Sequence, residues 1–544
     1  MYLLIYALWF LWELKYILFW LYLWQLKEYH TARFFDHFRT DKGKKLLFSL
    51  EQDFKLVFLL LLLLNPGLFD YIFSVLVLIY FAELMIFSRS ILIRGVKKPK
   101  WTIKTLFLTV VSFTVPIVFL NSVLSLEKEA QLSWFIIFDI LTPLIVSIIV
   151  LLFQPIFVAF RNNTLIKAQV KIERIKSLSG LKVVAITGSY GKTSTKEFLT
   201  TILSKKFKVL STKNHQNSEI GIAKCILEDL KPNHQIFIAE VGAYDKGKVK
   251  EVCSIIKPKI GVVTGVNEQH LALFGSLENL LSAEGGGELA EALRKEGLLV
   301  VNGDNKYCLD LYKKFNGNKN LYSQSNQKVD SDIWSDSVTV SKDNVSFLAI
   351  DKSKNMMHFG VRVLGGQNVQ NLLGAILIAK ELGMSFEETS EACKNILPEQ
   401  GGMVLKKGKF GIKIIDSSYS ANPDGVLADL DYLSIFHNKK IIIMPCIIEL
   451  GDKSAEIHER IGRKIAEVCD LAIITSKDKF KEIERGFNQV KNTDILRRSD
   501  KNVAKCLLCD KPQDIYSTIT LFCKEGDVIL LEGRVPSELI NLLT

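Results

Sequence analysis

Apolar residues are concentrated in the first third of the chain, in runs that are longer than a strand or the buried face of a globular helix. Five such runs cover residues 2–24, 47–64, 68–87, 103–120 and 134–153. Each approaches the ~20 residues that a helix needs to cross a bilayer. The second is the weakest, because Glu51, Asp53 and Lys55 interrupt its first half. The pattern predicts a helical membrane region over residues 1–160, with about five spans.

Basic residues between these runs indicate an orientation. Lysine and arginine are concentrated in three segments, residues 27–45, 89–104 and 161–176. The alternate loops are short or acidic, so the positive-inside rule places the amino end outside and everything after residue 161 in the cytoplasm. This orientation also explains much of the formal net charge of +11, and we expect no nucleic-acid partner. Met1 leads directly into apolar residues, so no cleavable signal peptide is expected.

Two charged residues, Glu13 and Lys15, lie within the first apolar run. Ionisable residues inside a membrane are candidates for function. We favour the simpler interpretation, in which this helix is interfacial or the two charges lie near the interior of a helical bundle.

From residue 181 the pattern becomes that of a soluble α/β protein. Residues 181–186 form a short apolar run containing Val183, Val184 and Ile186, which is typical of a buried parallel strand. A helical pattern begins at Ser194, and the sequence GSYGKT lies between them. This order of strand, glycine turn and helix is the context of a phosphate-binding loop.

The loop residues have distinct expected roles. Glycines at 188 and 191 allow backbone N–H groups to approach phosphate oxygens, Lys192 supplies a positive charge, and Thr193 offers a hydroxyl to Mg²⁺. The expected cofactors are therefore ATP and Mg²⁺. We expect the nucleotide to be bound by Gly188, Ser189, Tyr190, Gly191, Lys192, Thr193 and Ser194.

The loop is shorter than the general pattern G-x-x-x-x-G-K-[ST], which requires glycine where this chain has Ile186. Its form, T-G-x-x-G-K-[ST]-[ST], resembles that of the Mur ligase family, the ATP-dependent amide ligases of peptidoglycan assembly. Seven further segments resemble family motifs in the family's order, and the last two are similar to those of the MurF type, which adds D-alanyl-D-alanine. They are NHQNSEIG (214–221), FIAEVGAYDKG (237–247), VTGVNEQHLALFGSLE (263–278), VNGDN (301–305), LGGQNVQNLLGA (364–375), IDSSYSANPDG (415–425) and IIELGDKSAEIHERIG (447–462).

The resemblance implies a mechanism and a set of site residues. ATP phosphorylates a donor carboxylate, and an amine then attacks the acyl phosphate to form the amide. Thr193 and Glu240 would hold Mg²⁺, and His270 would be a ligand of a second ion. Lys192, His270 and Glu284 would be catalytic. Asn368 and Asn371 would lie near the adenine, and the tentative substrate contacts are Asn217, Ser218, Asp416, Tyr419 and Asn422.

The chain departs from the family pattern at several of these positions. Glu284 stands where many members carry a carbamylated lysine, and we hypothesise that it supplies the same negative charge permanently; the alternative is that it only starts a helix. Gln367 and Ser417 replace a usual His and a usual acid. These changes weaken the transfer of substrate-contact residues, and the roles of Glu449 and His458 stay open.

The expected fold class is α/β, with a helical transmembrane region, a phosphate-loop central domain and a Rossmann-like carboxy-terminal domain. We place these parts at residues 1–160, 161–400 and 401–544. Residues 333–363 are expected to be rich in strands and residues 316–332 to be the most loop-like stretch. All nine cysteines lie beyond residue 220 and are expected to be free thiols in a reducing cytosol. Strands are expected in the last part at residues 412–415, 440–444, 471–475 and 528–532.

The expected function is ligation of D-Ala-D-Ala to a UDP-muramoyl-tripeptide at the cytoplasmic face of a multi-pass membrane protein. Family members of this type begin with a small soluble domain that binds the uridine nucleotide, and this chain has no room for one. The donor could therefore be lipid-linked, and membrane enzymes of cell-wall synthesis are possible partners. The alternatives are a related ligase or amidating subunit with another carboxylate substrate, or a membrane protein that only senses a nucleotide.

Overall fold

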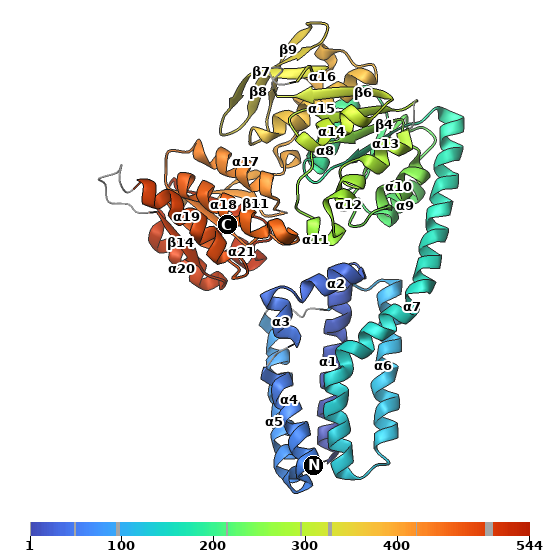
Figure 1. Ribbon diagram of the computed structural model, residues 1–544, viewed down its shortest axis with the longest axis vertical. Coiled ribbons are helices and arrows are strands. Elements are labelled where there is room, and N and C mark those ends of the chain that lie inside the picture. Colours follow the sequence, from blue (N-terminus) through green and yellow to red (C-terminus); the bar gives the residue numbers. More distant parts are fainter. Residues whose placement is uncertain are drawn as a thin grey trace. The chain divides into compact units, whose positions relative to one another are not determined.

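The computed structural model describes residues 2–47, 50–93, 98–213, 216–293, 296–324, 329–419, 421–494 and 504–544. The chain divides into two compact units, Met1–Asn162 and Asn163–Thr544. The first is helical and the second is α/β, so the predicted fold class is confirmed (Figure 1).

The described residues of the first unit form helices connected by short turns. Helix α1 packs against both α5 and α6, and α4 packs against α5 (Figure 1). The elements are α1 (Tyr2–Leu26), α2 (Thr31–His37), α3 (Asp41–Leu47), α4 (Leu50–Leu64), η1 (Pro66–Leu68), α5 (Phe69–Ile93), α6 (Ile103–Val123) and the first part of α7 (Lys128–Ser179).

Four helices in the described part of the chain are long and apolar enough to cross a membrane, whereas the sequence predicted about five. They are Leu3–Leu26, Phe69–Arg89, Ile103–Val123 and Ala130–Ser179. The second apolar run forms α4, which has 15 residues. At 1.5 Å per residue, such a helix is shorter by itself than the ~30 Å of a bilayer's hydrocarbon core.

The interior of this bundle contains a network of buried charges. The Lys55 ammonium lies 2.8 Å from the Asp139 carboxylate, and both side chains are almost completely buried. Asp139 also accepts hydrogen bonds from the Trp9 indole at 2.7 Å and the Tyr80 hydroxyl at 2.6 Å. Glu13 is buried as well. The interpretation that Glu13 lies in a bundle interior is confirmed.

The second unit begins with the last turns of α7, where the sequence suggested a basic loop. Its apolar positions Leu165, Ala168, Ile172 and Ile175 recur at helical spacing and pack into the core of the central sheet, which explains why this basic segment is helical. The central sheet has the order β2-β3-β1-β4-β5-β6-β7-β8-β9 among the described strands.

Strands β1 to β7 of this sheet pair in parallel, and β8 runs antiparallel to both β7 and β9. The strands are β1 (Lys182–Thr187), β2 (Val209–Ser211), β3 (Ile236–Glu240), β4 (Ile260–Val263), β5 (Leu298–Asn302), β6 (Asn318–Ser323), β7 (Ile333–Val340), β8 (Val345–Asp351) and β9 (Met356–Val361). The excursion at residues 333–363 is therefore confirmed. The expected loop at 316–332 is wrong in part, because its polar residues Asn318 to Asn320 pair through their backbones with β5; residues 325–328 lie outside the described ones.

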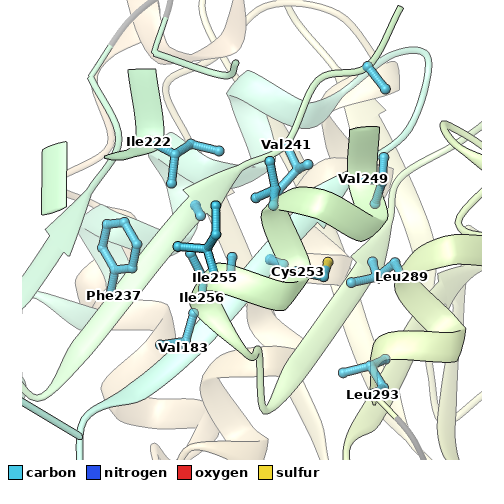
Figure 2. Close-up of a cluster of buried hydrophobic side chains, with 14 of the residues drawn as sticks. Val183, Ile222, Phe237, Val241, Val249, Cys253, Ile255, Ile256, Leu289 and Leu293 are labelled. Carbon is cyan, nitrogen blue, oxygen red and sulfur yellow. The ribbon is translucent and has the colours of Figure 1, made fainter. Parts of the chain in front are cut away.

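Helices cover both faces of the central sheet. One face carries α9 (Glu219–Glu228), α10 (Lys248–Ile256) and α13 (Gly287–Leu293), whose apolar side chains form the core in Figure 2. There Ile255 and Ile256 of α10 lie among Val183 of β1 and Phe237 of β3. The opposite face carries α8 (Lys192–Leu203), α15 (Gln367–Glu381) and α16 (Phe386–Cys393). Further short helices are α11 (Leu271–Phe274), α12 (Leu277–Ser282) and α14 (Lys306–Lys314).

A second sheet has the order β10-β11-β15-β12-β13-β14, and all its pairs except β10–β11 are parallel. All four strands predicted for this part of the chain are present, within one or two residues. The strands are β10 (Val404–Lys407), β11 (Lys413–Ser417), β12 (Lys440–Met444), β13 (Leu471–Ile474), β14 (Lys505–Leu508) and β15 (Val528–Glu532). The helices are α17 (Pro423–Ser434), α18 (Ser454–Val468), α19 (Phe480–Asp494), α20 (Pro512–Phe522) and α21 (Ser537–Leu543). All nine cysteines are free, as predicted.

Candidate active site

The phosphate-binding loop follows the carboxyl end of β1 and leads into α8. Gly188 has φ +138° and Gly191 has φ +76°, and a Cβ at Gly191 would lie 2.5 Å from Asn371 Oδ1. Glycine is therefore required for both the backbone conformation and the close approach. Helix α8 starts at Lys192, two residues before the sequence predicted, and no side chain caps it. Its first N–H groups are thus available to an anion.

Lys192 is folded back onto the loop. Its Nζ donates to the carbonyl of Gly188 and lies 3.4 Å from that of Ser189. A lysine on a flexible stem can exchange such carbonyl contacts for phosphate oxygens. The side chain is therefore placed beside the helix end where the sequence predicted it to act.

Three residues predicted from separate motifs meet next to Lys192. Thr193 Oγ1 donates to Glu240 Oε1 at 3.1 Å, and Asn217 Nδ2 donates to the same oxygen at 3.3 Å. Ser218, by contrast, accepts from Gly221 N at 3.2 Å and caps α9. A hydroxyl beside a carboxylate is the kind of oxygen pair that Mg²⁺ binds together with substrate phosphates, so these residues fit that ion.

Sequence reasoning missed Lys196, which lies one helical turn after Lys192. Its side chain is fully buried, with Nζ 3.4 Å from Glu240 Oε2 and 3.0 Å from Glu197 Oε1. The signal in the sequence was its position four residues after Lys192 in an amphipathic helix, which places both lysines on the same side.

His270 and Glu284 are brought together behind the loop. His270 Nδ1 lies 2.9 Å from Glu284 Oε1, and Ser189 Oγ donates to Glu284 Oε2 at 3.0 Å. Burial alone would lower the pKa of His270, but the carboxylates of Glu284 and Glu449 raise it above its usual value. Burial would likewise raise the pKa of Glu284, yet His270 and Lys192 hold it below its usual value. The pair is thus arranged to be ionised.

Glu284 does not start a helix, since it lies between α12 and α13 with its carboxylate buried. No three His, Cys, Asp or Glu side chains of the described residues are arranged to hold a metal ion. In the structure, His270 is hydrogen-bonded to Glu284. The role of either residue toward a second ion stays a prediction.

Replacing Glu284 with alanine is expected to lower kcat by about 10- to 100-fold, because it removes the buried partner that orients His270 and the loop hydroxyl of Ser189. Steady-state kinetics of the purified full chain measures the effect. Glu291→Ala, at a side chain that is 70% exposed, is the matched control. Unchanged kcat in the Glu284 variant alongside the control would contradict a role for this carboxylate.

The amides of Asn368 and Asn371 are used within the protein. Asn368 Nδ2 donates to the carbonyls of Leu364 and Gly401, and Asn371 Nδ2 donates to Asn368 Oδ1 at 3.1 Å. Asn371 Oδ1 also lies against the loop at Gly191. They brace the phosphate-binding loop, and their contact with adenine stays a prediction.

The carboxy-terminal part contributes polar residues beside the loop after β4. Asn267 Nδ2 donates to Asn422 Oδ1 at 3.2 Å and to Asp424 Oδ2 at 3.0 Å. Tyr419 is 62% exposed. Burial would raise the pKa of Asp416, but Lys406, 2.6 Å away, and Ser418 hold it below its usual value. Of the three expected contacts in this part of the chain, Asn422 is hydrogen-bonded to the loop after β4. Tyr419 lies near enough to Glu240 for burial and that carboxylate to raise the pKa of its hydroxyl.

His458 has a structural role. Its Nε2 accepts from the backbone N–H of Ile447 at 3.0 Å and its Nδ1 donates to the carbonyl of Ser454 at 2.6 Å, so the ring must be neutral. It fixes the turn that carries Glu449, whose φ is +70° and whose Oε2 lies 3.7 Å from His270 Nε2.

Burial lowers the pKa of His458 below its usual 6.5, which predicts a pH-dependent stability. The unfolded chain binds the proton more readily than the folded one. The stability that neutral His458 contributes is therefore fully present above about pH 6.5 and is lost as pH falls through the folded pKa. The free energy of unfolding is measured with denaturant at about pH 7.5 and about pH 5.5. It is expected to fall less between these two pH values in His458→Asn than in the wild type. Equal losses in the two proteins would contradict the assignment.

Comparison with known proteins connects this site to one family. Residues 186–379 match the family model of the Mur ligase middle domain, and residues 403–535 match that of the Mur ligase, glutamate ligase domain. The UDP-N-acetylmuramoyl-tripeptide–D-alanyl-D-alanine ligase of Synechocystis is 29% identical over 370 residues, or 66% of this chain and 75% of that protein. The Escherichia coli enzyme of the same name is 26% identical over 281 residues, or 52% of this chain and 61% of that protein.

Solved structures share the fold. MurF from Acinetobacter baumannii superposes with a TM-score of 0.60 at 22% identity, over 69% of this chain and 79% of that chain. MurF from Thermotoga maritima, solved in complex with ADP, gives a TM-score of 0.58 at 23% identity, over 70% of this chain and 83% of that chain.

Proposed function

Because the chain belongs to the Mur ligase family of ATP-dependent ligases, we propose that it joins D-alanyl-D-alanine to a UDP-N-acetylmuramoyl-tripeptide. That is the reaction named for its relatives in Synechocystis and Escherichia coli. The observation that carries the proposal is the contact of Thr193 with Glu240 at the start of α8, beside Lys192. The Lys192 ammonium, the Thr193 hydroxyl and the Glu240 carboxylate thus lie together at a helix end whose N–H groups can bind an anion.

The reaction has two chemical steps. An oxygen of the donor's terminal carboxylate attacks the γ-phosphorus of ATP, the bond to the β,γ-bridging oxygen breaks, and ADP leaves. The amine of D-Ala-D-Ala then attacks the acyl carbon, inorganic phosphate leaves with one former carboxylate oxygen, and the amine loses a proton. Both steps depend mainly on positioning and on neutralising phosphate charge.

The residues of this chain supply these two requirements. The free N–H groups at the start of α8 and the Lys192 ammonium, once released from the Gly188 carbonyl, would stabilise charge on the transferred phosphoryl group. Thr193 and Glu240 would hold Mg²⁺, which neutralises phosphate charge when bound. Asn422 and Asp424, linked to Asn267, would position the amine side of the site.

We further propose that the first unit inserts into the cytoplasmic membrane and that the second unit acts in the cytoplasm. The four long apolar helices support this location. Tethering would raise the enzyme's effective concentration near membrane-bound partners of cell-wall synthesis. It also gives a reason to test a lipid-linked donor as the second candidate.

The test is phosphate release by the detergent-purified full chain with ATP, Mg²⁺ and UDP-muramoyl-tripeptide, with and without D-Ala-D-Ala. We expect release that requires both the donor and the acceptor. Release only when a lipid-linked donor replaces the soluble one would favour the second candidate. Release that is independent of the acceptor with either donor would contradict a ligase function.

A further inference from the structure

The buried Lys196 has no role in the chemistry described above. A lysine in a protein interior is unfavourable unless its charge is paired. Lys196 has two carboxylate neighbours, Glu197 and Glu240, and its side chain is 0% exposed. Glu197 remains partly exposed, whereas Glu240 is nearly buried beside the phosphate-binding loop. Lys196 therefore pairs, from the protein interior, with the Glu240 carboxylate that is proposed to bind Mg²⁺.

The two oxygens of Glu240 are used differently. Oε1 accepts from Thr193 and Asn217, at the side of the phosphate-binding loop. Oε2 lies 3.4 Å from the Lys196 ammonium. A doubly charged ion bound to Oε2 would be brought close to this fixed positive charge and repelled. Only Oε1 is then well placed to serve as a metal ligand.

We propose that Lys196 makes Glu240 a one-oxygen ligand and thereby sets the preference of this site for Mg²⁺ over Ca²⁺. Mg²⁺ forms a compact octahedron at about 2.0–2.1 Å and is bound through one or two carboxylates, waters and phosphates. Ca²⁺ takes about 6–8 oxygens at about 2.3–2.6 Å and often uses both oxygens of a carboxylate. Withholding Oε2 therefore costs Ca²⁺ a ligand that Mg²⁺ does not need. This inference rests on the proposed use of Mg²⁺ and ATP.

The test measures binding of a fluorescent, non-hydrolysable ATP analogue to the detergent-purified full chain, with either Mg²⁺ or Ca²⁺. We expect the wild type to bind the analogue more tightly in Mg²⁺. In Lys196→Met the ratio of the two affinities is expected to fall about tenfold, the scale of residues that orient metal ligands. Lys196→Arg, which keeps the charge, is expected to retain most of the preference.

Lys176→Met is the matched control, since Lys176 is a partly buried lysine of the same unit that donates to the carbonyls of Ile256 and Lys257. Its affinity ratio is expected to equal that of the wild type. A wild-type ratio in a folded Lys196→Met protein would overturn the inference and leave the proposed function intact. Absence of nucleotide binding by the wild type in both metals would overturn both.

Glu197→Gln provides an independent arm if Lys196→Met does not fold. It removes the more exposed partner and leaves Glu240 as the carboxylate paired with Lys196 in the described structure. The preference for Mg²⁺ is expected to equal or exceed that of the wild type. A fall in the preference would overturn the inference.

Discussion

Replacing Lys192 with methionine is expected to reduce kcat for ATP-dependent ligation by about 10³-fold, the scale of a residue that stabilises charge on a transferring phosphoryl group. Its Nζ lies against the Gly188 and Ser189 carbonyls, at the uncapped start of α8. Methionine keeps the length of the stem but removes the charge. Phosphate release under saturating substrates measures the loss.

Lys250→Met is a suitable control, because that lysine is 68% exposed and lies in α10. It is expected to retain wild-type kcat. If Lys192→Met also retained wild-type kcat while remaining folded, the loop would not be the site of phosphoryl transfer.

Breaking the buried pair of Lys55 and Asp139 is expected to destabilise the helical bundle by about 3–5 kcal/mol, because the remaining charge is left without its partner in a dry interior. The Lys55 ammonium lies 2.8 Å from Asp139 and 3.5 Å from the centre of the Trp12 ring. Asp139→Asn removes the carboxylate that is paired with the lysine. Unfolding in detergent, followed by tryptophan fluorescence, measures the free energy.

The double variant Lys55→Met/Asp139→Asn distinguishes the cost of an unpaired buried charge from the cost of altered side-chain packing. Replacing both members of a buried ion pair is often close to neutral, so the double variant is expected to recover most of the stability lost in Asp139→Asn. Nucleotide binding by the second unit should be unchanged in both. A double variant less stable than Asp139→Asn would show that the charges do not stabilise each other.

The sequence was most informative where the decisive residues are contiguous. The strand, glycine turn and helix around GSYGKT are encoded within about twenty residues, so the loop could be predicted without knowledge of distant contacts. The β-branched run at residues 181–186 likewise predicted the buried strand β1, because a central parallel strand is apolar on both faces. Four strands of the second sheet were also predicted. Motif order identified Thr193, Asn217 and Glu240, which the structure brings together.

The sequence was least informative where two distant segments meet. Lys196 and Glu240, or Lys55 and Asp139, carry no signal of their pairing in a single sequence. His458 lies in a family-like motif, yet its ring is used to fix a turn, which only its two backbone partners reveal. Strand β6 was missed because its polar first half pairs through the backbone, which side-chain patterns do not report.

The measurement that tests the central claim most directly follows oxygen from the donor into phosphate. The full chain would be supplied with ATP, Mg²⁺, D-Ala-D-Ala and a UDP-muramoyl-tripeptide carrying ¹⁸O in both oxygens of its terminal carboxylate. Ligation through an acyl phosphate predicts that each phosphate released with a pentapeptide product contains one ¹⁸O atom. Phosphate without ¹⁸O would contradict the account, since ATP would then be cleaved without activating the donor carboxylate.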